Sequence, residues 1–106
     1  SDTVLETQNT AISVANVTYN ATTDELTVTV NNTGASQLTV GKTDLLVDGQ
    51  YRSGWEEVAT VEGVDTRLWL AGETLTAAVT APEEPARIKI VTENGVSVTA
   101  TEVVVV

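Results

Sequence analysis

The feature that most constrains the fold is an alternation of apolar and polar residues, interrupted by turn residues at short intervals. Between Glu25 and Asn31 the side chains of Leu26, Val28 and Val30 alternate with polar ones, which is typical of a strand with one buried and one solvated face. Similar runs recur at spacings of roughly 8 to 12 residues, and no helical periodicity follows the first ten residues. The pattern therefore predicts an all-β fold of about seven or eight short strands.

Turn signals indicate how these strands connect. In Thr43–Arg52 (TDLLVDGQYR) the apolar residues flank Asp48-Gly49, two residue types that tolerate positive φ, so we expect a tight hairpin. Asn94-Gly95 predicts a second hairpin near the end of the chain. The alternation between residues 12 and 19 slips by one residue around Ala15-Asn16, which indicates a β-bulge or a bend.

Size and cysteine content refine the fold class. At 106 residues, the chain is long enough for one domain with one core. Cysteine is absent, so the disulfide-linked antibody type of domain is excluded. We expect an immunoglobulin-like antiparallel β-sandwich over residues 11–106, preceded by a tether over residues 1–10.

Charge and composition exclude several classes of function. The formal charge is −10, from 15 acidic and 5 basic residues, whereas nucleic acids and anionic lipid headgroups require a positive surface. The acidity has two readings that stay open: a surface that keeps the protein in solution, or adaptation to high salt. Histidine and cysteine are both absent, so catalytic triads that use histidine and metal sites built on imidazole or thiolate are excluded.

No pattern of reactive residues predicts an enzyme. Gly41-Lys42-Thr43 resembles the end of a phosphate-binding loop, but Ser36 stands where that loop needs glycine. Paired carboxylates at residues 56–57 and 83–84 are typical of a solvated face. We therefore expect no catalytic residues, no metal site and no cofactor.

Partner binding is the remaining class of function, and exposed aromatic residues and strand edges are its usual carriers. Trp69 lies between two leucines and is either core or an exposed anchor, whereas Trp55 lies between glycine and glutamate and is predicted to be exposed. The C-terminal valines are either a buried last strand or an edge that pairs with a partner strand, including one from a second copy in a homodimer. The candidate contact residues are Tyr51, Trp55, Trp69, Val103, Val104, Val105 and Val106.

Three Asn-X-Ser/Thr sequons begin at Asn16, Asn20 and Asn31. They indicate either an extracellular, glycosylated surface or a chance occurrence in a threonine-rich chain. Both readings stay open from the sequence.

Three stretches together resemble a known family. They are NNTGASQLTVGKTDLLVDGQYR (Asn31–Arg52), LWLAGETL (Leu68–Leu75) and PARIKIVTENGVSVTA (Pro85–Ala100). In these runs the chain resembles the soluble domain of the accessory F and G proteins of the archaeal flagellum, the archaellum. The resemblance covers most of the chain after about residue 28 and rests on patterns of strands and turns.

The resemblance implies a pilin-like N-terminal membrane helix followed by a β-sandwich on the pseudoperiplasmic or outer side of the cell envelope. In that family the F protein is thought to bind the S-layer and, with its G partner, to act as a stator. Residues 1–10 would be the remainder of the helix exit, since no run of roughly 20 apolar residues occurs here. Partners would be S-layer protein or the accessory partner, and the family contributes no catalytic residues.

Two alternatives remain from the sequence. Archaellins, the filament subunits, have related sandwich domains, so the chain could be the outer domain of a filament subunit. A carbohydrate-binding module would use Trp55 and Trp69 as a stacking platform. We expect the first function, an archaellum stator component that anchors the motor to the envelope.

Overall fold

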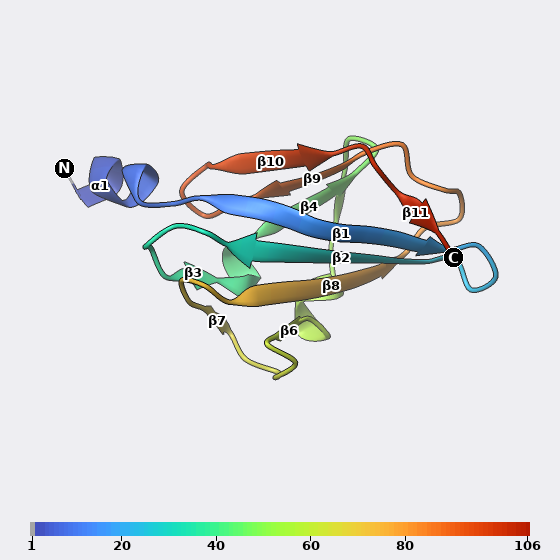
Figure 1. The fold of residues 1–106 in the computed structure, drawn as a ribbon, viewed down its shortest axis with the longest axis horizontal. Helices are drawn as coiled ribbons and strands as arrows, with labels where there is room; N and C mark the ends of the chain where they lie inside the picture. The colour runs from blue at the N-terminus through green and yellow to red at the C-terminus, as the bar shows by residue number, and fades with distance from the viewer. Residues whose placement is uncertain (1) are drawn as a thin grey trace.

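The computed structural model describes residues 2–106, which form two main β-sheets with a short helix at the N-terminus (Figure 1). The five-stranded sheet has the order β11-β1-β2-β8-β6 and the four-stranded sheet the order β10-β9-β4-β5, while β3 and β7 pair separately. The elements are α1 (Asp2–Gln8), β1 (Ile12–Asn20), β2 (Glu25–Asn32), β3 (Leu38–Thr39), the 3-10 helix η1 (Val40–Lys42), β4 (Asp44–Val47), β5 (Gln50–Arg52), the 3-10 helix η2 (Trp55–Glu57), β6 (Thr60–Val61), β7 (Leu68–Trp69), β8 (Thr74–Thr80), β9 (Ile88–Val91), β10 (Ser97–Ala100) and β11 (Val104–Val105).

The core lies between the two main sheets and is built by the alternation seen in the sequence. Leu26, Val28 and Val30 are fully buried, and Ile88 and Ile90 of β9 belong to the same cluster. Burial of each such side chain contributes about 1.5 to 3 kcal/mol. The prediction of an immunoglobulin-like β-sandwich is confirmed.

One strand pair departs from the expected antiparallel arrangement. β11 pairs with β1 in parallel, with Thr18 opposite Val104 and Tyr19 opposite Val105. The chain leaves β10 in the four-stranded sheet and crosses to the five-stranded sheet. It therefore reaches β1 running in the same direction, as the arrows in Figure 1 show.

The predicted turns and the predicted bulge are both present. Asp48 and Gly49 have φ values of 50° and 83° and connect β4 to β5, with Val47 opposite Gln50. Two consecutive positive φ values characterise the type I′ turn, whose twist matches that of a hairpin. The register between β1 and β2 shifts between Val14 and Asn16, as the sequence predicts.

Tyr19 joins the end of β1 to the chain that follows β8. Its side chain is buried, and its hydroxyl donates to the carbonyl oxygen of Ala81 at 2.7 Å and lies 3.2 Å from Asp24 Oδ1. Burial raises the pKa of this hydroxyl, and its hydrogen bond to Asp24 and the negative charges of Asp24, Glu84 and Glu83 raise it further. The folded state therefore favours the neutral tyrosine.

We expect this tyrosine to make stability depend on alkaline pH. Because its folded pKa lies above the unfolded value of about 10, its contribution is complete below pH 10 and is lost as the pH rises through the folded pKa. Urea denaturation from about pH 8 to about pH 12 should show a decline in unfolding free energy that is smaller in Tyr19→Phe. Tyr51→Phe, which removes an exposed hydroxyl, should retain the wild-type decline, and equal profiles for all three proteins would contradict the assignment.

The helix α1 joins the sandwich through hydrogen bonds that fix its exit. The carbonyl oxygens of Asn9 and Ala11 accept four backbone N–H groups from residues 33–36 at 2.8 to 3.1 Å, and Asn94 Nδ2 donates to Thr10 Oγ1 at 2.7 Å. We call residues 9–11 with residues 33–36 the helix junction. The structure shows helix over most of the segment interpreted as a tether, and the role of that segment stays a prediction.

Gly34 is the point of closest approach in the helix junction. A Cβ atom there would lie 2.4 Å from the oxygen of Asn9 and 2.5 Å from the nitrogen of Ala11, both backbone atoms that cannot rotate away. We expect Gly34→Ala to lower the unfolding free energy by about 1 to 3 kcal/mol, measured by chemical denaturation. Gly41→Ala is the matched control, because a Cβ atom at Gly41 meets nothing within 4 Å; equal stability of the two variants would contradict the close contact.

Candidate interaction surface

Tyr51 has the position expected of a residue that contacts a partner protein. It sits in β5, the edge strand of the four-stranded sheet, directly after the Asp48-Gly49 turn and opposite Leu46 of β4. Its side chain is 72% exposed. An exposed aromatic ring on a rigid edge strand suits a protein contact, and the contact itself stays a prediction.

The two tryptophans are both buried, so neither is an exposed anchor. Trp69 is 0% exposed, in agreement with the core alternative. The expectation that Trp55 is exposed is wrong: it is 2% exposed, because η2 folds back onto the sandwich together with the buried Ala59 and Val61. The turn into η2 uses Gly54 in the left-handed region, which reverses the chain and directs Trp55 inward. A stacking platform made of the two rings, as a carbohydrate-binding module would need, is therefore absent.

The two buried indoles differ in their hydrogen bonding. Trp69 Nε1 donates to the carbonyl oxygen of Glu73 at 2.9 Å, and the Glu73 carboxylate accepts the backbone N–H of Leu70 at 2.8 Å. Trp55 Nε1 is buried without a hydrogen-bond partner. Trp69 therefore organises the turn before β8, whereas Trp55 acts through packing alone.

This difference predicts unequal effects of removing the indole nitrogen. Trp69→Phe loses the hydrogen bond from the indole to the Glu73 carbonyl oxygen, which keeps the backbone N–H of Asn32 as a donor at 3.0 Å. Trp55→Phe removes a donor that has no acceptor. We expect Trp69→Phe to cost about 1 kcal/mol more than Trp55→Phe, measured by urea denaturation followed by circular dichroism. A larger loss for Trp55→Phe would contradict the assigned hydrogen bonds.

The C-terminal valines are divided between the core and the edge. Val103 packs against the core, whereas Val104, Val105 and Val106 are 59%, 48% and 66% exposed. β11 is the edge strand of its sheet, and among the described residues it pairs on one side only, with β1. The buried-strand alternative is therefore wrong for the last three valines, and the edge alternative describes their position.

The three sequon asparagines lie in different environments. Asn16 is exposed in the bulge of β1. Asn20 accepts backbone N–H groups of the following turn at 2.9 and 3.1 Å, and Asn31 Oδ1 accepts the hydroxyl of Thr74 at 2.7 Å. Asn16 is thus the most accessible of the three candidate glycosylation sites, and modification of all three stays a prediction.

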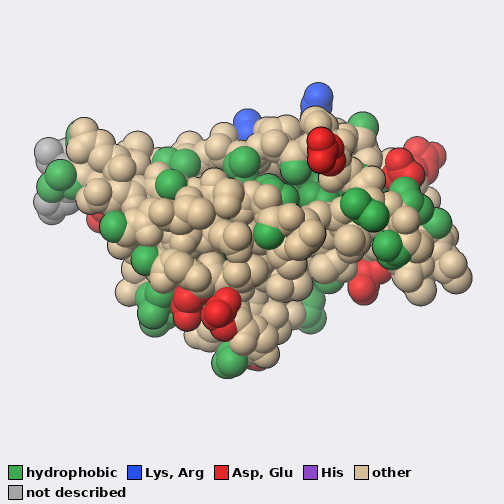
Figure 2. All heavy atoms as spheres, in the orientation of Figure 1, with side chains coloured by type: hydrophobic (Ala, Val, Ile, Leu, Met, Phe, Trp, Pro, Cys, Tyr) green, Lys and Arg blue, Asp and Glu red, His purple; other side chains and the backbone are tan. Residues whose placement is uncertain are grey.

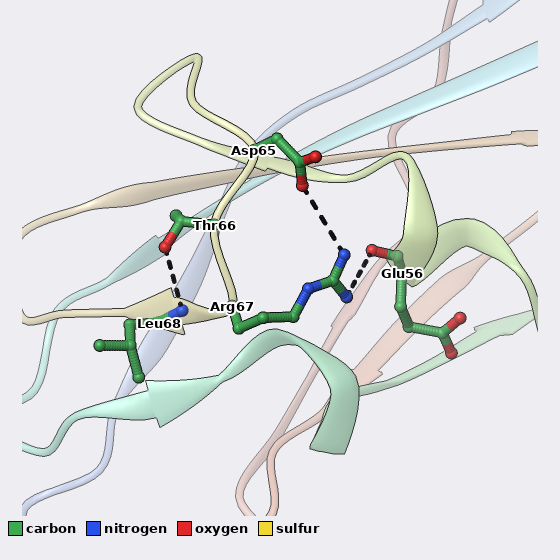
Figure 3. A network of polar contacts seen from close by, with 5 residues as sticks. All are labelled: Glu56, Asp65, Thr66, Arg67 and Leu68. Atoms are coloured by element: carbon green, nitrogen blue, oxygen red, sulfur yellow. Dashed lines mark hydrogen bonds and ion pairs between the residues drawn. The ribbon is translucent and has the colours of Figure 1, made fainter.

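A polar network holds the loop before β7 against η2 (Figure 3). Arg67 Nη1 donates to the carbonyl oxygen of Glu56 at 3.1 Å, and Arg67 Nη2 lies 3.7 Å from Asp65 Oδ1. The backbone N–H of Leu68 donates to Thr66 Oγ1 at 3.4 Å. The ion pair is exposed and contributes less than about 1 kcal/mol, so the network mainly positions the loop.

The same region exposes apolar side chains that the sequence reasoning missed. A signal was present, because leucines on both sides of a buried Trp69 must point outward in a regular strand. The exposed ion pair of Arg67 with Asp65 lies beside these side chains (Figure 3). The exposed apolar residues are Val58, Val64, Leu68 and Leu70.

Charges are unevenly distributed over the surface. In the face shown in Figure 2, most of the visible acidic groups lie toward the ends and the lower rim, while the centre over β1 and β2 is polar or apolar. Across residues 2–106 no group of acidic side chains comes together in a way that could hold a metal ion. The part of the chain that the structure describes also contains no helix long and apolar enough to cross a membrane.

Comparison with known proteins finds similarity at the level of structure. No protein-family model matches the chain, and no curated protein matches its sequence. The archaellum periplasmic stator protein FlaG from Sulfolobus acidocaldarius has a similar structure, with a TM-score of 0.56 and 17% identity over 86% of this chain and 97% of that chain. The FlaF–FlaG stator complex from the same organism gives 0.49 and 17% over 83% and 89%. A CARDB domain from Pyrococcus furiosus, solved in complex with di-metal ions, gives 0.44 and 18% over 93% and 90%. The chain thus shares the fold of an archaellum periplasmic stator domain.

Proposed function

We propose that this domain is a non-enzymatic structural and interaction domain of the archaellum, a stator component that anchors the motor to the cell envelope. Its partner would be S-layer protein or an accessory stator protein. The observation that carries the proposal is the similarity in fold to FlaG, which extends over 97% of that chain. The three sequence runs that resemble the accessory F and G proteins point the same way.

The helix junction suits a part that carries load. A stator must transmit force between its anchor and its contact without folding back on itself. Here α1 leads into β1 through four backbone hydrogen bonds to residues 33–36, and Asn94 reinforces the same point through Thr10. Load on the helix would therefore pass directly into the sheet, because paired strands resist deformation better than a flexible linker does.

Two edges of the sandwich supply the proposed contacts. Tyr51 marks the edge of the four-stranded sheet, and Val104–Val106 mark the edge of the five-stranded sheet. Exposed apolar residues on rigid strand edges are suited to bind a partner through side chains and backbone together. We place the domain on the outer or pseudoperiplasmic side of the envelope, anchored by a membrane helix that would precede α1.

A pull-down with isolated S-layer protein of the source organism tests this proposal. The immobilised domain should retain S-layer protein at both low and high salt, since the proposed contacts are largely apolar. Val104→Glu should weaken retention by about tenfold, the change expected when a charge is placed in an apolar contact. Val64→Glu is the matched control, because Val64 and Val104 are both 59% exposed.

Two outcomes of the pull-down would count against the proposal or against the assigned contact. Absence of retention for the wild-type domain at both salt concentrations, with either S-layer protein or the accessory stator protein as prey, would overturn the proposed function. Equal loss in Val64→Glu and Val104→Glu would leave the anchoring role in place and move the contact away from β11.

A further inference from the structure

Over residues 12–17, the outer edge of β1 has no partner strand within the described part of the chain. β11 pairs with Thr18 and Tyr19 only, whereas Ile12–Val17 pair with β2 on the opposite side. β10 is likewise an edge strand, since it pairs only with β9. Each sheet therefore presents an open strand edge on the same side of the sandwich, where β1 and β10 lie next to each other (Figure 1).

A groove runs between these two edges. It has a volume of about 460 Å³ and is lined by residues 13–17 of β1 and residues 98–102 after the start of β10. Its lining is mixed, with polar side chains such as Asn16, Thr99 and Glu102 beside apolar ones. The partly buried hydrophobic residues that pack against the core also come from these strands and the segment entering β11. They are Ile12, Val14, Val98, Ala100 and Val103.

Charged residues are sparse along β1 and β10 in a strongly acidic protein. Residues 7–23 and 94–101 include no Asp, Glu, Lys or Arg, although the chain carries a net charge of −10, and Glu102 is the one charged residue that lines the groove. In Figure 2 green and tan side chains cover most of this region, with one acidic group in its upper part and two basic groups at the upper rim. Exposed strand edges are normally protected by charged residues or proline, and β1 and β10 contain neither. β1 does contain a bulge, a feature that also protects strand edges. A partner strand would have to match the changed spacing of backbone hydrogen-bonding groups at the bulge.

The strand already bound to this edge shows what kind of segment it accepts. β11 is part of a run of four valines, uncharged and β-branched, and it lies along the second half of β1 in parallel. The backbone N–H of Val106 also donates to the carbonyl oxygen of Tyr19 at 2.9 Å. The unpaired part of this edge, residues 12–17 of β1, directly precedes the residues that pair with β11.

We propose that Ile12–Val17 of β1 form a strand-addition site for an extended, uncharged segment of a partner protein rich in β-branched residues. The incoming segment extends the five-stranded sheet beside β1, and its inward side chains contact Val14, Val98 and Ala100 in the groove. Backbone hydrogen bonds supply the affinity, and the contacts with Val14, Val98 and Ala100 select apolar side chains at the inward positions. The inference rests on the proposed interaction role of the domain and does not depend on which envelope protein supplies the segment.

A defined peptide tests the site on the intact domain. The probe is acetyl-(Thr-Val)₃-amide, titrated into the ¹⁵N-labelled protein and followed by two-dimensional NMR. We expect saturable shifts at residues 12–17 and 97–102, together with slower hydrogen exchange for the amides of β1 that point to the open edge. The same peptide with every backbone amide N-methylated should not bind, because it cannot donate the hydrogen bonds of an added strand.

A pair of matched substitutions locates the binding. Ala15→Lys places a charge at an exposed position of the groove and should weaken peptide binding by about tenfold. Ala71→Lys introduces the same side chain at an exposed turn position outside the groove and should leave binding unchanged. Unaltered spectra elsewhere in each variant show that the fold is intact.

Three outcomes would overturn the inference: no saturable shifts, shifts confined to other strands, or equal binding of the N-methylated peptide. None of these outcomes bears on retention of S-layer protein in the pull-down. If the peptide fails while the wild-type domain still retains S-layer protein, the anchoring role stands and the strand-addition site does not. If the peptide binds but retention is absent, the site stands and the archaellum assignment fails.

Discussion

The pairing of β1 with β2 is the interaction on which the rest of the structure depends. It runs from Ile12 opposite Asn32 to Asn20 opposite Glu25, with a shift in register at the bulge. The helix junction lies at the start of β1, and β11 pairs with the end of β1. β10 lies beside β1 across the groove. Any force or partner that reaches the N-terminal helix, the valine edge or the groove therefore acts on the same strand.

Local sequence patterns predicted those parts of the fold that local chemistry determines. The Asp48-Gly49 hairpin follows from two residues that tolerate positive φ, and the burial of Leu26, Val28 and Val30 follows from the period of a strand. The bulge was visible as a slip in that period. Each of these features depends on residues close together in the chain, so no knowledge of tertiary packing was needed.

The errors concern residues whose environment is set by distant parts of the chain. Trp55 stands between glycine and glutamate, yet the reversal at Gly54 turns it into the core. The C-terminal valines have the composition of a buried strand, but β11 reaches the five-stranded sheet at its edge and leaves three of them exposed. Hydrophobicity predicts that a residue prefers burial, whereas topology decides whether a second layer is there to bury it.

The distribution of charge bears on the proposed binding role. Net charge keeps a protein in solution through repulsion between molecules, but that repulsion decays over about 8 Å at physiological ionic strength. A carboxylate within that distance of an open strand edge would therefore oppose pairing with another chain, and one farther away would not. β1 and β10 contain no acidic residue, whereas Glu102 lines the groove between them, so a strand added to β1 would lie near one carboxylate. For the proposed strand addition, the Glu102 carboxylate and the net charge of −10 would disfavour an acidic contacting segment and leave an uncharged one unopposed.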